Sequence, residues 1–107
     1  MIERDTMTKI VKVKTGSKFE EHGSYSRVVA IENWVFVSNT AGRNPQTKEI
    51  PEDITDQTMQ VFANIEAALE AVGACLADVV ASRVFIQNPE DTHAVMTAVG
   101  EKYRGIN

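Results

Sequence analysis

Residues 38–51 read S-N-T-A-G-R-N-P-Q-T-K-E-I-P, and this stretch decides the fold because it joins the end of a strand to the start of a long helix. Its Gly, Asn and Pro residues predict a loop. The strand before it, W-V-F-V at residues 34–37, is apolar on both faces. Such a pattern is typical of a central strand that helices or another subunit cover on each side.

Two strands are expected upstream of the loop as a hairpin. Branched residues in 25–31 predict the first strand, and residues 34–38 form the second. Between them, Glu32-Asn33 is a two-residue loop, in which Asn33 tolerates the positive φ that such turns require. Residues 10–14 alternate weakly and predict an edge strand, and residues 19–23 predict a polar connection.

A long helix is predicted at residues 53–72, because apolar side chains recur at spacings of three and four. Asp53 or Thr55 can cap its start, and Gly73 can adopt the left-handed turn that ends it. The expected apolar stripe consists of Met59, Phe62, Ile65, Leu69 and Val72.

The C-terminal part predicts a second buried strand and a second helix. Residues 79–87 are rich in branched residues, and Asn88-Pro89 is typical of a helix start. The inner face of this helix is expected to carry Val95, Val99 and Tyr103, and Gly105 to end it. The order β-β-β-α-β-α predicts an α+β fold with two helices packed on one face of a mainly antiparallel sheet.

Length and composition favour one small globular domain. The chain has 107 residues, 43% hydrophobic and 24% charged, and a net charge of −4, which argues against nucleic acid as the main partner. The sequence shows no secretory signal and no apolar run of about twenty residues, so no membrane association is expected. A single cysteine, Cys75, favours a cytoplasmic location. We interpret Cys75 as a small buried hydrophobe; with His22 and His93 it is too sparse to predict a metal site, and a catalytic Cys–His pair stays open.

Further motif residues lie before and after the loop of residues 38–51. Tyr25 stands thirteen residues before Ser38, within Gly23-Ser24-Tyr25, and Gln57 and Asn64 follow in D-I-T-D-Q-T-M-Q-V-F-A-N-I. In this order and spacing the chain resembles the Rid family, the reactive intermediate deaminases formerly called YjgF proteins, from about residue 23 to 103. The resemblance implies a chorismate-mutase-like fold with a further strand pair after the second helix. A single Rid-like domain over residues 1–107, incomplete at its C-terminus, is therefore expected.

The same resemblance implies an activity. Rid proteins hydrolyse reactive enamines and imines, such as 2-aminoacrylate, to a 2-keto acid and ammonia without a cofactor. They are typically homotrimers with a pocket at each subunit interface. The family's carboxylate-binding arginine and a later glutamate would fall beyond Asn107, so the resemblance leaves the carboxylate-binding cation of this chain open.

Five residues match pocket positions of the family. Tyr25 and Ser38 are the candidate catalytic residues, and Asn39, Thr40 and Met96 are the candidate substrate-binding residues. Tyr25 could instead anchor a contact between strands, Ser38 could simply end its strand, and Met96 could belong to the core. No histidine is placed to activate Ser38, so a Ser–His–Asp nucleophile is not expected. Asn39 replaces a usual glycine, and Met96 replaces an asparagine frequent in deaminating members.

Two arginines are possible substitutes for the missing cation. We expect Arg43 to be solvated and Arg83 to form a buried or interfacial salt bridge. Three functions remain open: a hydrolase of carboxylate-bearing imines or enamines, a non-catalytic metabolite-binding or regulatory protein, and an endoribonuclease or translation inhibitor. The acidic charge balance weakens the third.

Overall fold

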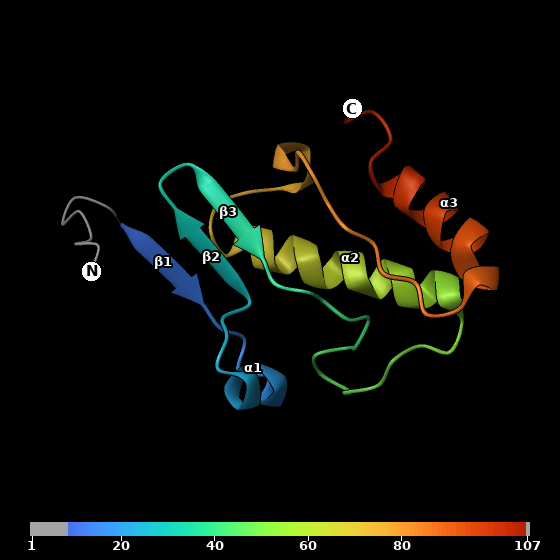
Figure 1. Cartoon of the computed structure of the whole chain (residues 1–107), viewed down its shortest axis with the longest axis horizontal. Coiled ribbons are helices and arrows are strands. Elements are labelled where there is room, and N and C mark those ends of the chain that lie inside the picture. The colour runs from blue at the N-terminus through green and yellow to red at the C-terminus, as the bar shows by residue number, and fades with distance from the viewer. Residues whose placement is uncertain (1–8, 107) are drawn as a thin grey trace.

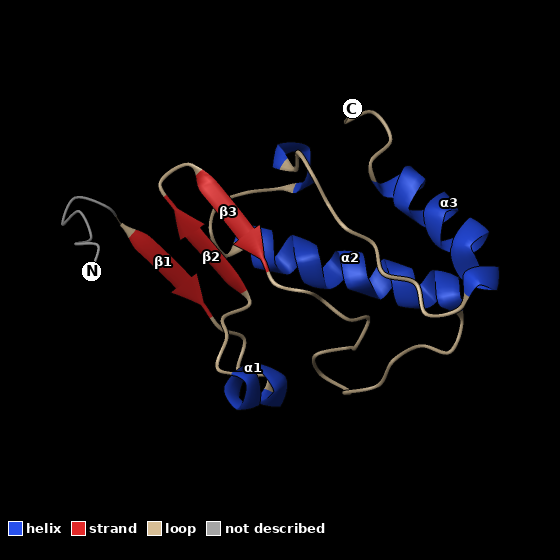
Figure 2. Cartoon of the chain, in the orientation of Figure 1, coloured by secondary structure: helices blue, strands red, loops and turns tan. Residues whose placement is uncertain are grey.

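The computed structural model describes residues 9–106, and it has an α+β architecture in which a small sheet packs on a long helix (Figures 1 and 2). The strands form one antiparallel sheet in the order β1-β2-β3. The elements are β1 (Ile10–Val13), α1 (Lys18–Gly23), β2 (Val28–Ile31), β3 (Trp34–Val37), α2 (Ile54–Glu70), two 3-10 turns η1 (Leu76–Asp78) and η2 (Pro89–Asp91), and α3 (Thr92–Lys102).

The predicted hairpin is confirmed. Ile31 of β2 pairs with Trp34 of β3, so Glu32 and Asn33 form the two-residue loop. The positive φ lies at Glu32 (52°), and Asn33 does not share it, so that detail of the prediction was wrong. At the other side of β2, β1 is the expected edge strand.

Helix α1 occupies the segment that we predicted as a polar connection. Ser17 caps its start by accepting a hydrogen bond from the backbone N–H of Phe19 at 3.1 Å, and Glu20 and Glu21 lie in its first turn. A serine cap followed by acidic residues is the normal signal of a helix start. The prediction missed it because the helix has only six residues and little apolar periodicity.

Helix α2 contributes Phe62 and Leu69 to the core. Asp53 caps it by accepting from the backbone N–H of Asp56 at 2.9 Å, and Gly73, with φ of 77°, lies beyond its end as expected. Met59 does not belong to the apolar stripe, because its side chain is exposed. The buried core cluster consists of Phe62, Leu69, Leu76, Val95 and Val99.

The predicted strand at residues 79–87 does not form. Figure 2 draws this segment as a loop, and Val80 is 89% exposed. A strand needs a neighbour with which to exchange backbone hydrogen bonds, and no strand of the described chain lies beside this segment. Only Val79 and Ile86 pack against the core cluster. Cys75 is also exposed, so the prediction of a small buried hydrophobe was wrong. Arg83 is exposed within the chain, so its salt bridge is not a buried one there, and an interfacial salt bridge stays a prediction.

Helix α3 follows η2 and packs against α2, which in turn packs against β3. Val95 and Val99 are buried, as predicted. The ring of Tyr103 meets that of Phe62 edge to face, with ring centroids 5.6 Å apart and an angle of 77° between the planes. These contacts hold α3 to the same core cluster against which Val35 and Val37 of β3 pack.

The two faces of β3 differ. Val35 and Val37 pack against the core cluster, whereas Trp34 and Phe36 on the other face are 62% and 59% exposed. Their rings stack with centroids 6.4 Å apart. Within the chain, the covering that we predicted for both faces is therefore present on one face alone.

Candidate functional site

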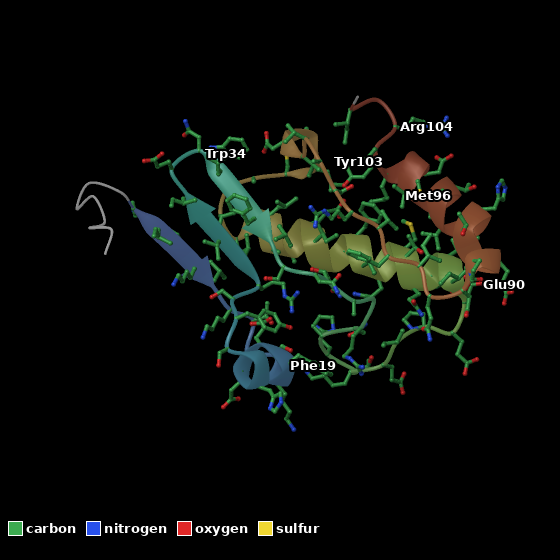
Figure 3. The ribbon with its side chains drawn as sticks, in the orientation of Figure 1. Phe19, Trp34, Glu90, Met96, Tyr103 and Arg104 are labelled. Carbon is green, nitrogen blue, oxygen red and sulfur yellow. The ribbon has the colours of Figure 1, made fainter. Side chains whose placement is uncertain are left out.

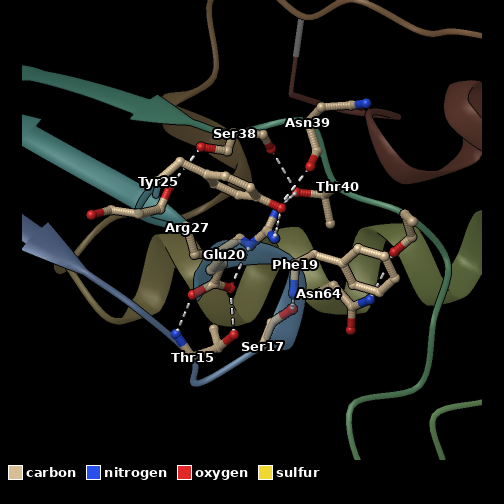
Figure 4. A network of polar contacts seen from close by, with 12 residues as sticks. Thr15, Ser17, Phe19, Glu20, Tyr25, Arg27, Ser38, Asn39, Thr40 and Asn64 are labelled. Atoms are coloured by element: carbon tan, nitrogen blue, oxygen red, sulfur yellow. Dashed lines mark hydrogen bonds and ion pairs between the residues drawn. The ribbon is translucent and has the colours of Figure 1, made fainter. Parts of the chain in front are cut away.

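A buried ion pair connects α1 to the start of β2. The Glu20 carboxylate lies 3.2 Å from Nε of Arg27, and the two side chains are 1% and 13% exposed (Figure 4). Thr15 donates to Glu20 from both its backbone N–H and its hydroxyl. Burial by itself would raise the pKa of Glu20, but these hydrogen bonds and the positive charge of Arg27 outweigh it, so the pKa lies below its ordinary value. Glu20 is therefore ionised at neutral pH.

The guanidinium of Arg27 holds the chain that follows β3. Its Nη1 donates to the backbone carbonyl of Asn39 at 2.8 Å and to Oγ1 of Thr40 at 3.2 Å. Its Nη2 lies 3.4 Å from the phenol oxygen of Tyr25. One charged group thus fixes Tyr25, Asn39 and Thr40 relative to one another, as the dashed contacts of Figure 4 show.

Ser38 is fixed by the backbone of the neighbouring strand. Its N–H donates to the carbonyl of Arg27 at 2.9 Å, and its hydroxyl donates to the carbonyl of Ser26 at 2.6 Å. Its own carbonyl accepts from the Thr40 hydroxyl at 2.7 Å. The hydroxyl proton of Ser38 is therefore used in the fold, while its oxygen lone pairs remain able to accept a hydrogen bond.

A hollow of about 300 Å³ lies beside this network. Its lining consists of Phe19, Tyr25, Arg27, Asn39, Ala41 and Arg43. Two aromatic rings restrain the two cations: the guanidinium carbon of Arg27 lies 5.4 Å from the ring centre of Tyr25, and that of Arg43 lies 5.4 Å from the ring centre of Phe19. Cation–π contacts of this kind hold a guanidinium while leaving its N–H groups free to donate.

Helix α2 fixes the far wall of the hollow. Nδ2 of Asn64 donates to the carbonyls of Ala41 and Arg43 at 3.0 and 2.9 Å, and Nε2 of Gln57 donates to the carbonyl of Pro51 at 3.1 Å. Gln57 and Asn64, which the sequence motif contains, thus both donate to backbone carbonyls of the loop. Gly42 is buried against Gln57, so the loop can approach the helix only without a side chain at that position.

The structure brings four of the five predicted site residues together. Tyr25 and Asn39 line the hollow, and Ser38 and Thr40 belong to the same hydrogen-bonded segment. Met96 does not join them: it lies on α3, is 48% exposed, and is well separated from Phe19 at α1 in Figure 3. The possibility that Met96 is a core residue is excluded by the same exposure.

Three residues of this site were missed or misjudged. Arg43 is half-buried, donates to the carbonyl of Lys48 at 2.6 Å and contacts Phe19, so the prediction of a solvated side chain was wrong. Glu20 and Arg27 were not singled out at all. A charged residue two positions after Tyr25, in a strand whose next residues are apolar, was the available signal for Arg27.

A second hollow, of about 430 Å³, lies at the C-terminal end of α2, between Glu66, Glu70 and residues 74–77. It is larger, but it contains no cation and none of the predicted site residues, and its carboxylates would repel an acid. Between residues 9 and 106, no group of three His, Cys, Asp or Glu side chains is placed to hold a metal ion. The helices of this same range are too short or too polar to cross a membrane.

Comparison with known proteins identifies the family and agrees with the fold. The family described as Endoribonuclease L-PSP matches residues 15–107. A 2-iminobutanoate/2-iminopropanoate deaminase of Dermatophagoides farinae is 36% identical over 83 residues, which are 77% of this chain and 65% of that protein. The chain thus spans about two thirds of the length of this relative.

Solved structures of the same family have a similar fold. Rv2704 of Mycobacterium tuberculosis, a member of the YjgF/YER057c/UK114 family, superposes with a TM-score of 0.81 at 33% identity, over 92% of this chain and 77% of its own. YyfA of Yersinia pestis, a Rid protein, gives 0.80 at 26% identity, over 91% and 78%. The chain belongs to the Endoribonuclease L-PSP family, which is the Rid or YjgF family. The α+β, chorismate-mutase-like fold is confirmed.

Proposed function

We propose that the protein is a Rid-type hydrolase that deaminates carboxylate-bearing imines and enamines to 2-keto acids and ammonia, in the cytoplasm and without a cofactor. The observation that carries the proposal is the hollow in which Tyr25 and Asn39 lie beside two arginines. A relative named as a 2-iminobutanoate/2-iminopropanoate deaminase matches 77% of the chain, and this supports the substrate class.

The reaction requires few functional groups from the protein. An enamine first tautomerises to the imine, as its β-carbon gains a proton and its nitrogen loses one. Water then adds to the imine carbon: a C–O bond forms, the C=N π bond breaks, and the nitrogen takes up a proton from the water. The hydroxyl proton of the carbinolamine passes to the nitrogen, and ammonia leaves as the C–N bond breaks and the C=O bond forms. The task of the site is to hold the acid and to position water and protons. The phenol oxygen of Tyr25 accepts from Arg27, which leaves its proton free to donate to the imine nitrogen or to the water. The oxygen of Ser38 can accept a hydrogen bond from that water.

We further propose that the protein is a homotrimer in which the outer face of the sheet is covered by other subunits. Trp34 and Phe36 are exposed on that face, and the register places Ile31 and Val29 opposite them on β2. Exposed aromatic side chains beside half-buried branched ones are typical of a protein–protein interface. The hollow lies at the end of the same sheet, so a neighbouring subunit is well placed to close it.

An imine assay tests the activity. An amino acid oxidase generates 2-iminopropanoate or 2-iminobutanoate in place, and the release of 2-keto acid is compared with a buffer control. We expect acceleration by the native chain, and a reduction of about 100-fold in Tyr25→Phe, because general acid–base groups contribute at least that much. Tyr103→Phe is the matched control, since Tyr103 packs against the core instead of lining the hollow. No acceleration with either imine would overturn the proposal.

One observation favours a second candidate, a metabolite-binding or regulatory protein without turnover. No carboxylate or imidazole is among the described side chains that line the hollow, so the site offers no ordinary general base. Asn39, in place of the usual glycine, adds a side chain to the lining of the hollow. Saturable binding of a 2-keto acid at this hollow, together with an unaccelerated imine assay, would favour this candidate over the enzyme.

A further inference from the structure

The hollow has an excess of positive charge. Arg27 and Arg43 both line it, and no acidic side chain does so among the described residues. The nearest compensating charge belongs to Glu20, but both of its oxygens are already used by Thr15 and Arg27 and its side chain is 1% exposed. Two cations beside one buried anion leave the hollow with a net charge of about +1, which an anionic ligand would neutralise.

Both guanidinium groups have N–H donors that contacts with the described residues do not fully use. Among residues 9–106, Nη2 of Arg27 makes one contact, the long one of 3.4 Å to Tyr25, near the limit for a hydrogen bond. For Arg43, only Nη1 has a protein acceptor in the described chain, the carbonyl of Lys48. Arg27 is thus held mainly through Nε and Nη1, and Arg43 through Nη1 and the ring of Phe19, which leaves N–H groups on Nη2 of each for a ligand. Planar N–H pairs of this kind match the two oxygens of a carboxylate.

The two arginines are held differently. Arg27 is 13% exposed and is fixed by Glu20, Asn39 and Thr40. Arg43 lies on a loop and is half-buried against Phe19, whose ring is itself exposed. One cation is therefore rigid and the other can adjust as a ligand enters. A hollow of about 300 Å³ is at the small end of ligand sites, which suits a short-chain acid.

We propose that Arg27 and Arg43 bind the carboxylate of a small 2-oxo or 2-imino acid, with Arg27 as the fixed donor and Arg43 as the adjustable one. The class of acid rests on the proposed function, whereas the preference for a carboxylate rests on the two cations alone. This assigns the carboxylate-binding cation that the sequence left open.

Calorimetric titration of the full chain with 2-oxobutanoate, and with 2-oxobutanamide as its uncharged match, tests the preference for a carboxylate. We expect the acid to bind at least about tenfold more tightly than the amide, because charge-assisted hydrogen bonds are roughly twice as strong as neutral ones. Equal affinity for acid and amide, or no binding of the acid, would overturn the proposal.

Substitution of Arg43 tests the residue itself. Arg43→Gln is expected to weaken binding of the acid about tenfold or more and to leave binding of the amide nearly unchanged. Arg104→Gln removes the same charge from an exposed side chain that pairs with Glu101 and does not line the hollow, so it should bind like the native chain. Equal losses in both variants would mean that only the net charge matters, and the proposal would fail.

Arg27 needs a second variant, because Arg27→Gln leaves the buried Glu20 carboxylate unpaired and can unfold the chain. Glu20→Gln with Arg27→Gln replaces the ion pair by two amides of similar shape. Circular dichroism identifies a folded variant, and the titration is then repeated on it. A folded double variant that still prefers the acid tenfold would overturn the role of Arg27.

The experiments can refute the proposed function and this inference independently of each other. Binding of 2-oxobutanoate that depends on Arg43 supports the inference even where the imine assay shows no turnover, which would refute the hydrolase alone. Conversely, imine hydrolysis that is unchanged in Arg43→Gln and in the double variant would support the hydrolase and refute the two-arginine site.

Discussion

The Glu20 carboxylate and the Arg27 guanidinium, 3.2 Å apart and almost wholly removed from solvent, join α1 to the segment that carries the candidate site. Arg27 reaches Asn39, Thr40 and Tyr25 from this pair. The ion pair therefore stabilises the fold and also positions the residues of the hollow. Its loss should affect both the stability of the chain and the geometry of the hollow.

Glu20→Ala is expected to lower the free energy of unfolding by about 3 kcal/mol, because removing one partner leaves a buried charge uncompensated. Glu66→Ala is the control: its pair with Lys102 is partly exposed, with N–O 3.0 Å, and should contribute less than about 1 kcal/mol. Urea unfolding followed by circular dichroism measures both. Similar losses in the two variants would contradict the importance of the buried pair.

The same carboxylate predicts a pH dependence of stability. Its folded-state pKa lies below the ordinary value of 4.5, so ionised Glu20 stabilises the folded chain above that pH. The stabilisation is lost as the pH falls through the lowered pKa. Urea unfolding from about pH 7 to about pH 3 should show a drop that is smaller in Glu20→Gln. Identical pH profiles for the two proteins would show that Glu20 is not its source.

Gly42→Ala tests the contact between the loop and α2. A Cβ at residue 42 would lie 2.5 Å from the backbone oxygen of Gln57, and a helix backbone cannot move aside cheaply. We expect a loss of about 1–3 kcal/mol in thermal or urea unfolding. Gly100→Ala, inside α3 with open space around it, should instead stabilise the chain by about 0.5–1 kcal/mol. A neutral Gly42→Ala would contradict the close approach.

The outer face of the sheet predicts a change of assembly. Replacing both Trp34 and Phe36 by Ser should convert the proposed trimer to a monomer without unfolding it, because both side chains are largely exposed within the chain. Light scattering at micromolar concentration measures the mass. Phe85→Ser removes a still more exposed ring from a different segment and should leave the assembly intact. A native chain that is already monomeric would refute the trimer.

The sequence predicted the elements whose signals are local. The hairpin at Glu32-Asn33 and the cap of α2 at Asp53 follow from turn chemistry, hydrophobic periodicity and capping, and the structure contains both. Residues 79–87 show the limit of this reasoning. Their branched residues favour a strand, but a strand forms only where a neighbour supplies backbone partners, and the described chain supplies none there.

The residues of the candidate site were likewise predicted only in part from the sequence. Tyr25 and Asn39 were found by their place in a motif, and the structure sets both beside the hollow. Arg27 and Glu20 were missed because an ion pair between residues seven apart, on different elements, has no periodic signal. Arg43 was misjudged because loop residues are usually solvated, and only its position over Phe19 shows otherwise.

Chemical-shift mapping with 2-oxobutanoate tests the central claim, that the hollow beside Tyr25 is the ligand site. Backbone amide signals of the full chain are followed during titration, with 2-oxobutanamide as the control. The account predicts saturable shifts confined to residues around Tyr25, Arg27, Asn39 and Arg43, and weaker ones with the amide. Shifts centred on Glu66, Glu70 and residues 74–77, or equal shifts from acid and amide, would contradict it.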